Sequence, residues 1–352
     1  MQLASLLLLV VGVSLSLAVP APKTSNGLRG QELVDHINKE GQWKAALHPR
    51  FAGKTIDQVR GHLGAIRKRP ANLTKSFKSS ELNDVVDFDS RAHWPNCADV
   101  IGYIYDQSAC GDCWAVSTAA SVSDQICVKS DGKDKTPVSA IDLTTCCKRC
   151  GGTFNGLETS VDKNLDGCQG GDVSEAYDYL YQVGVVSGSD YFRDSYCKPY
   201  PFAPCEHHNN KTAYQKCGDV VDTPKCTKSC QKGYKHTYDQ DRIFTEGIFS
   251  TEANVKEVQD FIKQYGSVVV TFDVYEDFLY YQSGVYQHTG DDEPIGGHAV
   301  RAIGWGTENE VDYWLLANQW NSDWGDNGLV KFIRGVNNCG IEDYVTVGGV
   351  KL

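Results

Sequence analysis

Two cysteines three positions apart mark a segment with the chemistry of a nucleophile. Cys110 and Cys113 lie within Gln107–Ala115, and small and apolar residues follow at helical spacing as far as the turn residues 130–132. This pattern predicts a helix that begins at Cys113. The unpaired N–H groups and the positive dipole at a helix N-terminus favour an anion, and a thiolate is one. Cys113 is therefore a candidate nucleophile, although either cysteine could instead be structural.

A nucleophilic thiol needs a cation beside it, because a free thiol with a pKa of about 8.5 is mostly protonated in neutral or acid solution. His298 is the best candidate among nine histidines, since two glycines precede it and it opens a predicted strand. Asn318 is placed to accept the ring N–H, and Trp320 to shield that bond from water. The Gln107 amide is a candidate oxyanion donor, and loss of such a donor costs on the order of 10²–10³ in rate.

These segments resemble those of the papain-like cysteine proteases. Gln-x-x-Cys-Gly-x-Cys-Trp, Gly-Gly-His-Ala and Asn-Gln-Trp match the nucleophile, histidine and asparagine segments of that family in order and approximate distance. Cys205-Glu-His-His208 narrows the resemblance to cathepsin B, and the likeness runs from about residue 32 to the C-terminus. Residues 313–325 are similar to gut cathepsin B enzymes of parasitic worms. The resemblance implies a Cys113, His298 and Asn318 triad with Gln107 in the oxyanion hole.

The expected fold class is α+β, with two lobes and the active-site cleft between them, as the family has. Residues 97–240 contain two predicted helices, beginning at Cys113 and at Val173. Residues 241–335 carry strand patterns, which are Ser267–Val274, His298–Trp305, Asp312–Trp320 and Gly328–Arg334. We therefore expect a helical lobe that carries the cysteine and a β-barrel-like lobe that carries the histidine and asparagine.

The N-terminal part has a different character. Residues 1–18 read as a signal peptide, with a membrane anchor as the alternative reading. Residues 19–83 contain no cysteine, and two helices are expected, at Glu32–Leu47 and Thr55–Ile66. The resemblance implies that this segment is an inhibitory propeptide that lies in the cleft against substrate direction, ahead of a catalytic domain at 84–352. A small helical domain without an inhibitory role is the alternative.

Fourteen cysteines behind a signal peptide indicate disulfides rather than the zinc site that Cys146, Cys147, Cys150 and Cys168 could otherwise form. Spacing alone leaves the pairing open. The resemblance implies six pairs, with Cys113 and Cys339 left free: Cys97–Cys127, Cys110–Cys168, Cys146–Cys226, Cys147–Cys150, Cys197–Cys230 and Cys205–Cys217.

The net charge of −11 and the absence of a basic stripe argue against nucleic acid as a partner. We expect a monomer without a metal or other cofactor and without a membrane span, secreted or delivered to a lysosome or acidic digestive compartment. Peptides and proteins are the expected substrates, and cystatin-type proteins and the propeptide the expected inhibitors. Asn72 and Asn210 are glycosylation sequons.

The resemblance also implies substrate-binding residues. Gly170, Gly171 and Gly297 would line the path of an extended peptide, although tight turns would also explain such glycines. Residues 197–230 match the occluding loop, in which His207 and His208 would bind a C-terminal carboxylate and His207 would pair with Asp106. Tyr344 stands where cathepsin B has a glutamate at the base of the S2 pocket.

Two residues depart from the family pattern. Asp112 replaces the usual Ser before the nucleophile, and we expect it to cap the helix. Gln319 stands where Ser usually precedes the Trp. Two other functions remain open, namely a catalytically weak, disulfide-rich binding protein on the same scaffold and a protease inhibitor built from residues 19–83.

Overall fold

A computed structural model describes residues 27–68, 86–151, 167–191, 195–205, 208–209, 212–251 and 254–352, with the backbone alone for 208–209 and 212–213. The expected signal peptide, the expected maturation region near residues 80–84 and the sequons at Asn72 and Asn210 lie outside these residues. Within the described part of the chain, no helix has both the length and the apolar character needed to cross a bilayer.

The helical lobe is organised around α5 (Cys113–Lys129), which begins and ends as the sequence predicts. Its side chains are small or apolar and buried almost throughout, because neighbouring elements cover it on every side. Ser139 caps α6 (Ala140–Cys146) and Asp172 caps α7 (Val173–Gln182), each by accepting a backbone N–H. The helices around α5 in this lobe are α3 (Ser90–His93), α4 (Ala98–Ile101), α6 (Ala140–Cys146) and α7 (Val173–Gln182).

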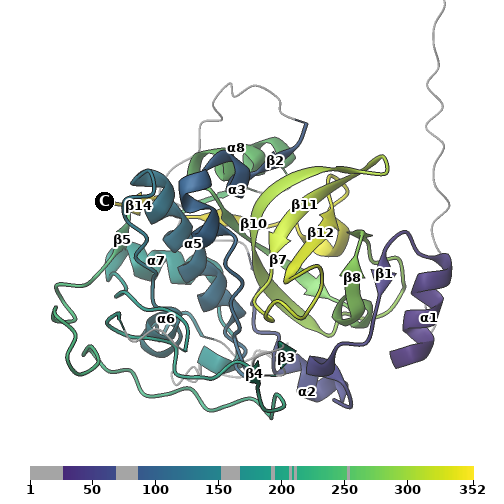
Figure 1. Cartoon of the computed structure of the whole chain (residues 1–352), viewed down its shortest axis with the longest axis horizontal. Helices are drawn as coiled ribbons and strands as arrows, with labels where there is room; N and C mark the ends of the chain where they lie inside the picture. The colour runs from purple at the N-terminus through teal and green to yellow at the C-terminus, as the bar shows by residue number, and fades with distance from the viewer. Residues whose placement is uncertain are drawn as a thin grey trace, which may run out of the picture.

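The second lobe is a largely antiparallel sheet in the strand order β6-β13-β7-β10-β11-β12-β9, with β2 paired to β10. Only the β12–β9 pair is parallel among these strands. The strands are β2 (Phe88–Asp89), β6 (Phe249–Thr251), β7 (Val268–Val274), β9 (Val285–Tyr286), β10 (Gly296–Glu308), β11 (Val311–Ala317), β12 (Leu329–Ile333) and β13 (Val345–Val347). The predicted strands are thus present, and the separate helical and β regions define the expected α+β class (Figure 1).

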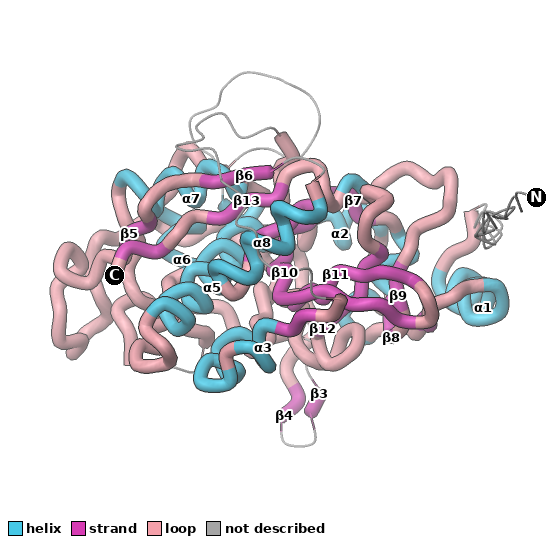
Figure 2. Tube along the Cα trace, turned by 90° about the horizontal axis from the view of Figure 1, so that it is seen from above, coloured by secondary structure: helices cyan, strands magenta, loops and turns pink. Residues whose placement is uncertain are grey.

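The long strand β10 connects the two lobes. It pairs with β7 along its first half and with β11 along its second, and the register shifts between Ala302 and Gly304. Helix α5 packs against β10, with Ala119 and Val122 in the same buried cluster as Ala299. Cys113, at the start of α5, is consequently brought close to the beginning of β10, where His298 lies. Helix α8 (Val255–Tyr265) lies beside α5 and β10 (Figure 2).

The smaller strands lie outside the main sheet. β5 (Phe244–Thr245) pairs with β14 (Val350–Lys351), and β3 (His208–Asn209) pairs with β4 (Thr212–Ala213) as a hairpin. β8 (Tyr281–Ser283) pairs with β1 (Lys44–Ala45), so a strand of the N-terminal segment docks on the β lobe.

The N-terminal segment has shorter helices than its sequence predicts. Helix α1 (Gly30–Glu40) stops at Gly41, because the chain turns there into β1 and pairs with β8. Helix α2 (Ile56–Arg60) begins at the predicted cap Thr55, with a complete capping box, but it ends before residue 62. Residues 64–66 instead lie between the two lobes, where their backbone hydrogen-bonds with the backbone of both.

Apolar side chains hold this N-terminal segment against the β lobe. Leu33, Ile37, Trp43 and Phe51 are buried in the same cluster as the interior of the sheet. Figure 1 shows α1 and β1 beside the edge of that lobe. The docking therefore draws on the hydrophobic effect, which scales with the apolar area removed from water.

Six disulfides join cysteines of the described chain: Cys97–Cys127, Cys110–Cys168, Cys146–Cys226, Cys147–Cys150, Cys197–Cys230 and Cys205–Cys217. These are the pairs that the family resemblance implies. Cys113 and Cys339 are free thiols.

Candidate active site

Cys113 lies at the first turn of α5, fully buried beneath the N-terminal segment. Its Sγ accepts a hydrogen bond from the Gly64 N–H at 3.4 Å. Burial raises the pKa of the Cys113 thiol to about 12, and the backbone amides of Gly64 and Ala299 offset this only in part. In this form of the protein the thiol is therefore protonated, and it is covered by another part of its own chain.

His298 is held between an amide and an indole. Its Nε2 donates to Asn318 Oδ1 at 2.8 Å, in the tautomer that leaves Nδ1 unprotonated, and the Trp320 ring stacks on the imidazole with centroids 4.6 Å apart. Burial, with a smaller contribution from the positive charge of Arg50, lowers the pKa of His298 to about 4, although the Asn318 hydrogen bond opposes this. The imidazole is therefore neutral over most of the pH range. Its other nitrogen, Nδ1, is buried and has no hydrogen-bond partner among the described residues.

Gln107 lies close to the nucleophile in sequence, and its side-chain NH2 group donates two hydrogen bonds. Nε2 donates to Cys110 O at 2.8 Å and to His62 O, in the N-terminal segment, at 3.0 Å. The Gln107 backbone N–H donates to Gln319 O at 3.0 Å, which ties this segment of the helical lobe to the end of β11. A carbonyl oxygen of the N-terminal segment thus occupies a donor that the sequence assigns to the oxyanion hole.

The N-terminal segment passes through the cleft as an extended chain. The Gly171 N–H donates to Gly64 O at 2.7 Å, and the Ile66 N–H donates to Gly171 O at 2.9 Å. On the opposite wall the Ala65 N–H donates to Gly297 O at 3.0 Å. The bridge between Ala65 and Gly171 is parallel.

Both walls carry a glycine where a side chain would not fit. A Cβ at Gly297 would lie 2.2 Å from Ala65 O, and a Cβ at Gly171 would lie within 2.7 Å of three atoms of the Trp114 ring. Gly170, with φ near +121°, turns the loop so that Gly171 faces the cleft. The Gly297 wall therefore accepts a peptide backbone and would exclude a side chain, whereas Gly171 is required by its close packing on Trp114.

A buried ion pair anchors the N-terminal segment beyond the thiol. Arg50 Nη1 donates to Asp106 Oδ1 at 3.0 Å, and Arg50 Nη2 donates to Ser108 O at 2.7 Å. The side chains of Arg50 and Asp106 are 3% and 5% exposed. Asp106 is the carboxylate that the resemblance pairs with His207, and here Arg50 holds it together with the Ser108 N–H and the Asn321 amide.

Asp112 does not cap α5 as the sequence predicts. Its carboxylate turns away from the helix and accepts hydrogen bonds from Thr144 Oγ1 at 2.8 Å and from the Tyr200 hydroxyl at 3.0 Å. The capping prediction is wrong because α6 and the 195–205 segment supply hydroxyl donors within the lobe. Burial raises the pKa of Asp112 to about 7. Gln319, the other departure from the family pattern, donates to Ala299 O at 2.6 Å and so braces β10 beside His298.

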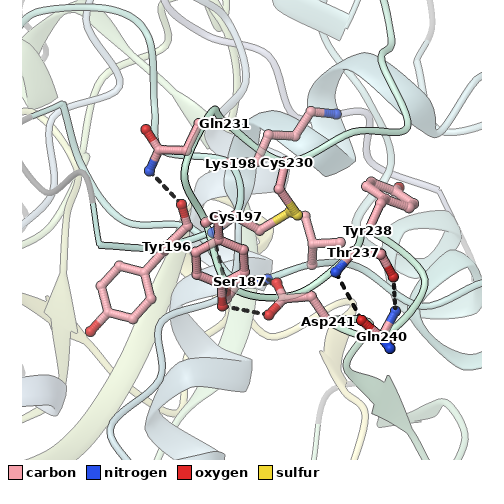
Figure 3. The surroundings of a disulfide bond; sticks show 12 residues. Ser187, Tyr196, Cys197, Lys198, Cys230, Gln231, Thr237, Tyr238, Gln240 and Asp241 are labelled. Atoms are coloured by element: carbon pink, nitrogen blue, oxygen red, sulfur yellow. Dashed lines mark hydrogen bonds between the residues drawn. A yellow bond between two sulfur atoms is a disulfide. The ribbon is translucent and has the colours of Figure 1, made fainter.

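Not every predicted residue can be placed. His207 lies outside the described residues, and of His208 only the backbone is described, in the β3–β4 hairpin. The base of that loop is anchored by the Cys197–Cys230 disulfide, next to Ser187 and Asp241, which hydrogen-bond to each other (Figure 3). Tyr344 is half-buried just before β13.

Sequence reasoning missed the cations of the N-terminal segment. Arg50 and Arg67 both reach carboxylates of the two lobes. By contrast the acidic residue Asp57 pairs with Arg60 inside the segment itself. For Arg50, the sequence signal of this role is a basic residue between two apolar residues, Pro49 and Phe51.

Comparisons with known proteins agree with this geometry. Residues 85–348 match the family model described as papain family cysteine protease. The chain is 42% identical over 330 residues to a cathepsin B-like cysteine proteinase of Schistosoma japonicum, covering 91% of this chain and 90% of that protein. It is 40% identical over 334 residues to cathepsin B-like cysteine proteinase 6 of Caenorhabditis elegans, covering 92% and 83%.

Among solved structures, proCathepsin B S9 from Trypanosoma congolense superposes with a TM-score of 0.74 at 32% identity, covering 92% of this chain and 99% of that one. The chain therefore belongs to the papain family of cysteine proteases. Within that family it is a cathepsin B-like cysteine peptidase, with the N-terminal segment docked as in a zymogen. That segment, residues 27–68 as described, is called the prosegment below.

Proposed function

We propose that the mature enzyme hydrolyses peptide bonds with Cys113 as nucleophile, His298 as general base and acid, and Asn318 as the residue that orients the imidazole. The observation that carries this proposal is the meeting of three elements at one point: the start of α5, the start of β10 and the end of β11. At that point the His298–Asn318 bond lies under Trp320, and Nδ1 of the same ring remains without a partner.

The proposed reaction begins with transfer of the Cys113 proton to Nδ1 of His298. The thiolate attacks the scissile carbonyl carbon, and the resulting oxyanion is stabilised by the Gln107 amide and the Cys113 backbone N–H. The imidazolium returns its proton to the leaving amine as the C–N bond breaks. A water molecule, deprotonated by His298, then hydrolyses the thioester and regenerates the thiol.

The prosegment opposes this chemistry in two ways. It buries Cys113 and His298, and burial holds the pKa of the thiol near 12 and that of the imidazole near 4, so both remain neutral. It also places an N–H of Gly64, rather than a carbonyl carbon, against the sulfur. When the prosegment leaves, water re-enters the cleft, the burial penalty falls for both groups, and the thiolate–imidazolium pair becomes accessible.

We further propose carboxydipeptidase activity beside endopeptidase activity. The basis is the sequence of the 197–230 loop, in which His207 and His208 can bind a terminal carboxylate. In the zymogen Arg50 holds Asp106, the partner that the resemblance gives to His207. Removal of the prosegment would free this carboxylate for the loop.

We also propose that the enzyme acts outside the cell or in a lysosome-like compartment. The predicted signal peptide, the six disulfides and the acidic composition suit a secreted or lysosomal-type peptidase of an acidic compartment. Cystatin-type proteins are expected to occupy the same cleft as inhibitors, and the enzyme is expected to act as a monomer.

Covalent labelling tests the proposal. After acid activation, a peptidyl epoxide should modify Cys113 stoichiometrically, as located by mass spectrometry, and should abolish peptide hydrolysis. His298→Ala should reduce labelling at least as strongly as hydrolysis, and Cys339→Ser, which removes the other free thiol, should leave both intact. Full hydrolysis by a Cys113→Ala variant would refute the mechanism, whereas an activated wild type that is neither labelled nor active would favour a binding protein on the same scaffold.

A further inference from the structure

An arginine of the prosegment lies in a site built by the β lobe beside the cleft. Arg67 Nη2 donates to Asp343 Oδ2 at 2.8 Å and to Gly340 O at 2.8 Å, and Nη1 donates to Asp273. The Arg67 side chain is only 14% exposed, whereas those of Asp273 and Asp343 are 37% and 38% exposed. Three acceptors on two elements thus surround one guanidinium.

The site is shaped for a cation and is not a chance cluster of acids. Gly340 has φ near +67°, and a Cβ there would lie 2.1 Å from Arg67 Nη2, so a side chain at this position would fill the space of the guanidinium. The Asn337 amide donates to Asp343 Oδ1 at 2.7 Å, which orients the other oxygen toward the cation. Asp273 is fixed in β7, in register with Gly297 of β10.

The position of Arg67 in the prosegment shows how far along the cleft this site lies from the thiol. The Gly64 N–H touches Cys113 Sγ, Ala65 pairs with Gly171 and Gly297, and Arg67 follows two residues further. A substrate runs through the same cleft in the opposite direction, so its acyl-side residues take the places of these prosegment residues. A side chain in the place of Arg67 belongs to a substrate residue beyond P2.

Activation must remove Arg67 together with the prosegment. Two carboxylates with oriented oxygens then remain at the rim of the cleft without the guanidinium that bridged them. Two like charges held close together repel each other, and an opposite charge between them relieves that repulsion. A guanidinium or ammonium group of a peptide is the ligand that fits this arrangement.

We propose that Asp273, Asp343 and Gly340 O form a subsite for a basic side chain at P3 or P4 of the substrate. The inference rests on the proposed peptidase function and specifies its substrate class as peptides with Arg or Lys upstream of an apolar P2 residue. Arg67 acts as the occupant of this subsite in the zymogen. The acceptors of this subsite do not include the side chain at position 344, where the family carries its acidic S2 residue.

The test compares fluorogenic peptides that differ only at P3 or P4, with Arg, Lys or norleucine there and Phe fixed at P2. With wild-type enzyme, titrated by a peptidyl epoxide, kcat/KM for Arg should exceed that for norleucine on the order of tenfold at one of these positions, as expected for charge-assisted hydrogen bonds to half-exposed groups. The preference should decline as salt is raised.

Isosteric variants locate the effect. Asp273→Asn and Asp343→Asn should each reduce the Arg/norleucine ratio, and the double variant should bring it close to one. Glu293→Gln removes the same charge from an exposed position between β9 and β10 and should keep the wild-type ratio. An equal rate for Arg and norleucine in the wild type, or an unchanged ratio in the double variant, overturns the subsite. A wild type that cleaves none of the peptides refutes the peptidase function itself.

Discussion

Removal of the Arg50 side chain should open the zymogen. Arg50 and Asp106 are 3% and 5% exposed, and Arg50 makes hydrogen bonds of 3.0 and 2.7 Å across the interface. Loss of one partner of a buried pair typically costs about 3–5 kcal/mol, because the remaining charge stays buried and uncompensated. Asp106 keeps the Ser108 N–H and the Asn321 amide as donors, so we expect the lower end of that range.

A cost of about 3 kcal/mol corresponds to a rise of roughly 10²-fold in the fraction of zymogen whose cleft is open. The assay is the initial rate at which a peptidyl epoxide labels Cys113 in the intact Arg50→Ala zymogen at pH 7. Mass spectrometry restricts the measurement to chains that still carry the prosegment, so autocatalytic processing does not contribute.

Arg29→Ala is the matched control. Arg29 also forms an ion pair across the interface, with Glu276 at 3.6 Å, but its side chain is 69% exposed. An exposed pair contributes at most about 1 kcal/mol, so labelling should rise less than about fivefold. If Arg50→Ala is labelled no faster than Arg29→Ala, the buried pair does not keep the zymogen closed and the reasoning is refuted.

Three further predictions concern the mature enzyme. Tyr344 lacks the charge of a glutamate, so Phe, Leu or Val should be preferred over Arg at P2, and Tyr344→Glu should raise Arg acceptance; faster cleavage of Arg-Arg than of Phe-Arg reporters by the wild type would contradict this. Burial raises the pKa of Asp112 from 3.8 to about 7, so the folded state binds more protons than the unfolded chain between those values. The stability of the wild type should therefore fall relative to Asp112→Asn as pH rises from about 4 to about 7, and a Tm difference that is independent of pH would exclude a titrating Asp112. His208→Ala should chiefly weaken release of C-terminal dipeptides at pH 5, whereas equal cleavage of a free-acid peptide and its amide by the wild type would exclude a carboxylate clamp.

The helices and strands with a regular hydrophobic pattern were predictable, because the pattern within each segment marks the residues that become buried. The small and apolar residues after Cys113 identify α5, and the alternation around His298 and Asn318 identifies β10 and β11. The spacing of these residues identified the parts of the site, since the chemistry requires a thiol, an imidazole and an amide. Their assembly at one point depends on packing of α5 against β10, which no local pattern specifies.

The missed features depend on contacts between distant segments. Residues 64–66 fall within a predicted helix, yet they are extended, because glycines of the cleft walls 100 or more positions away offer backbone partners. The Asp112 carboxylate prefers hydroxyl donors from Thr144 and Tyr200 to the helix amides next to it. Tertiary hydrogen bonds override the local helix preference in the first case and the local capping preference in the second. Sequence periodicity carries no information about such bonds.

The parallel bridge between Ala65 and Gly171 has a consequence for inhibitor chemistry. A peptide in this direction fills the cleft with its amide dipoles reversed, so the sulfur meets a hydrogen-bond donor and finds no electrophile within reach. Such a ligand resists hydrolysis because of the direction of its chain, and it needs no reactive group to inhibit the enzyme. A short peptide with the order of residues 64–67, rigidified in its extended form, would be a template for reversible inhibitors that the enzyme cannot digest.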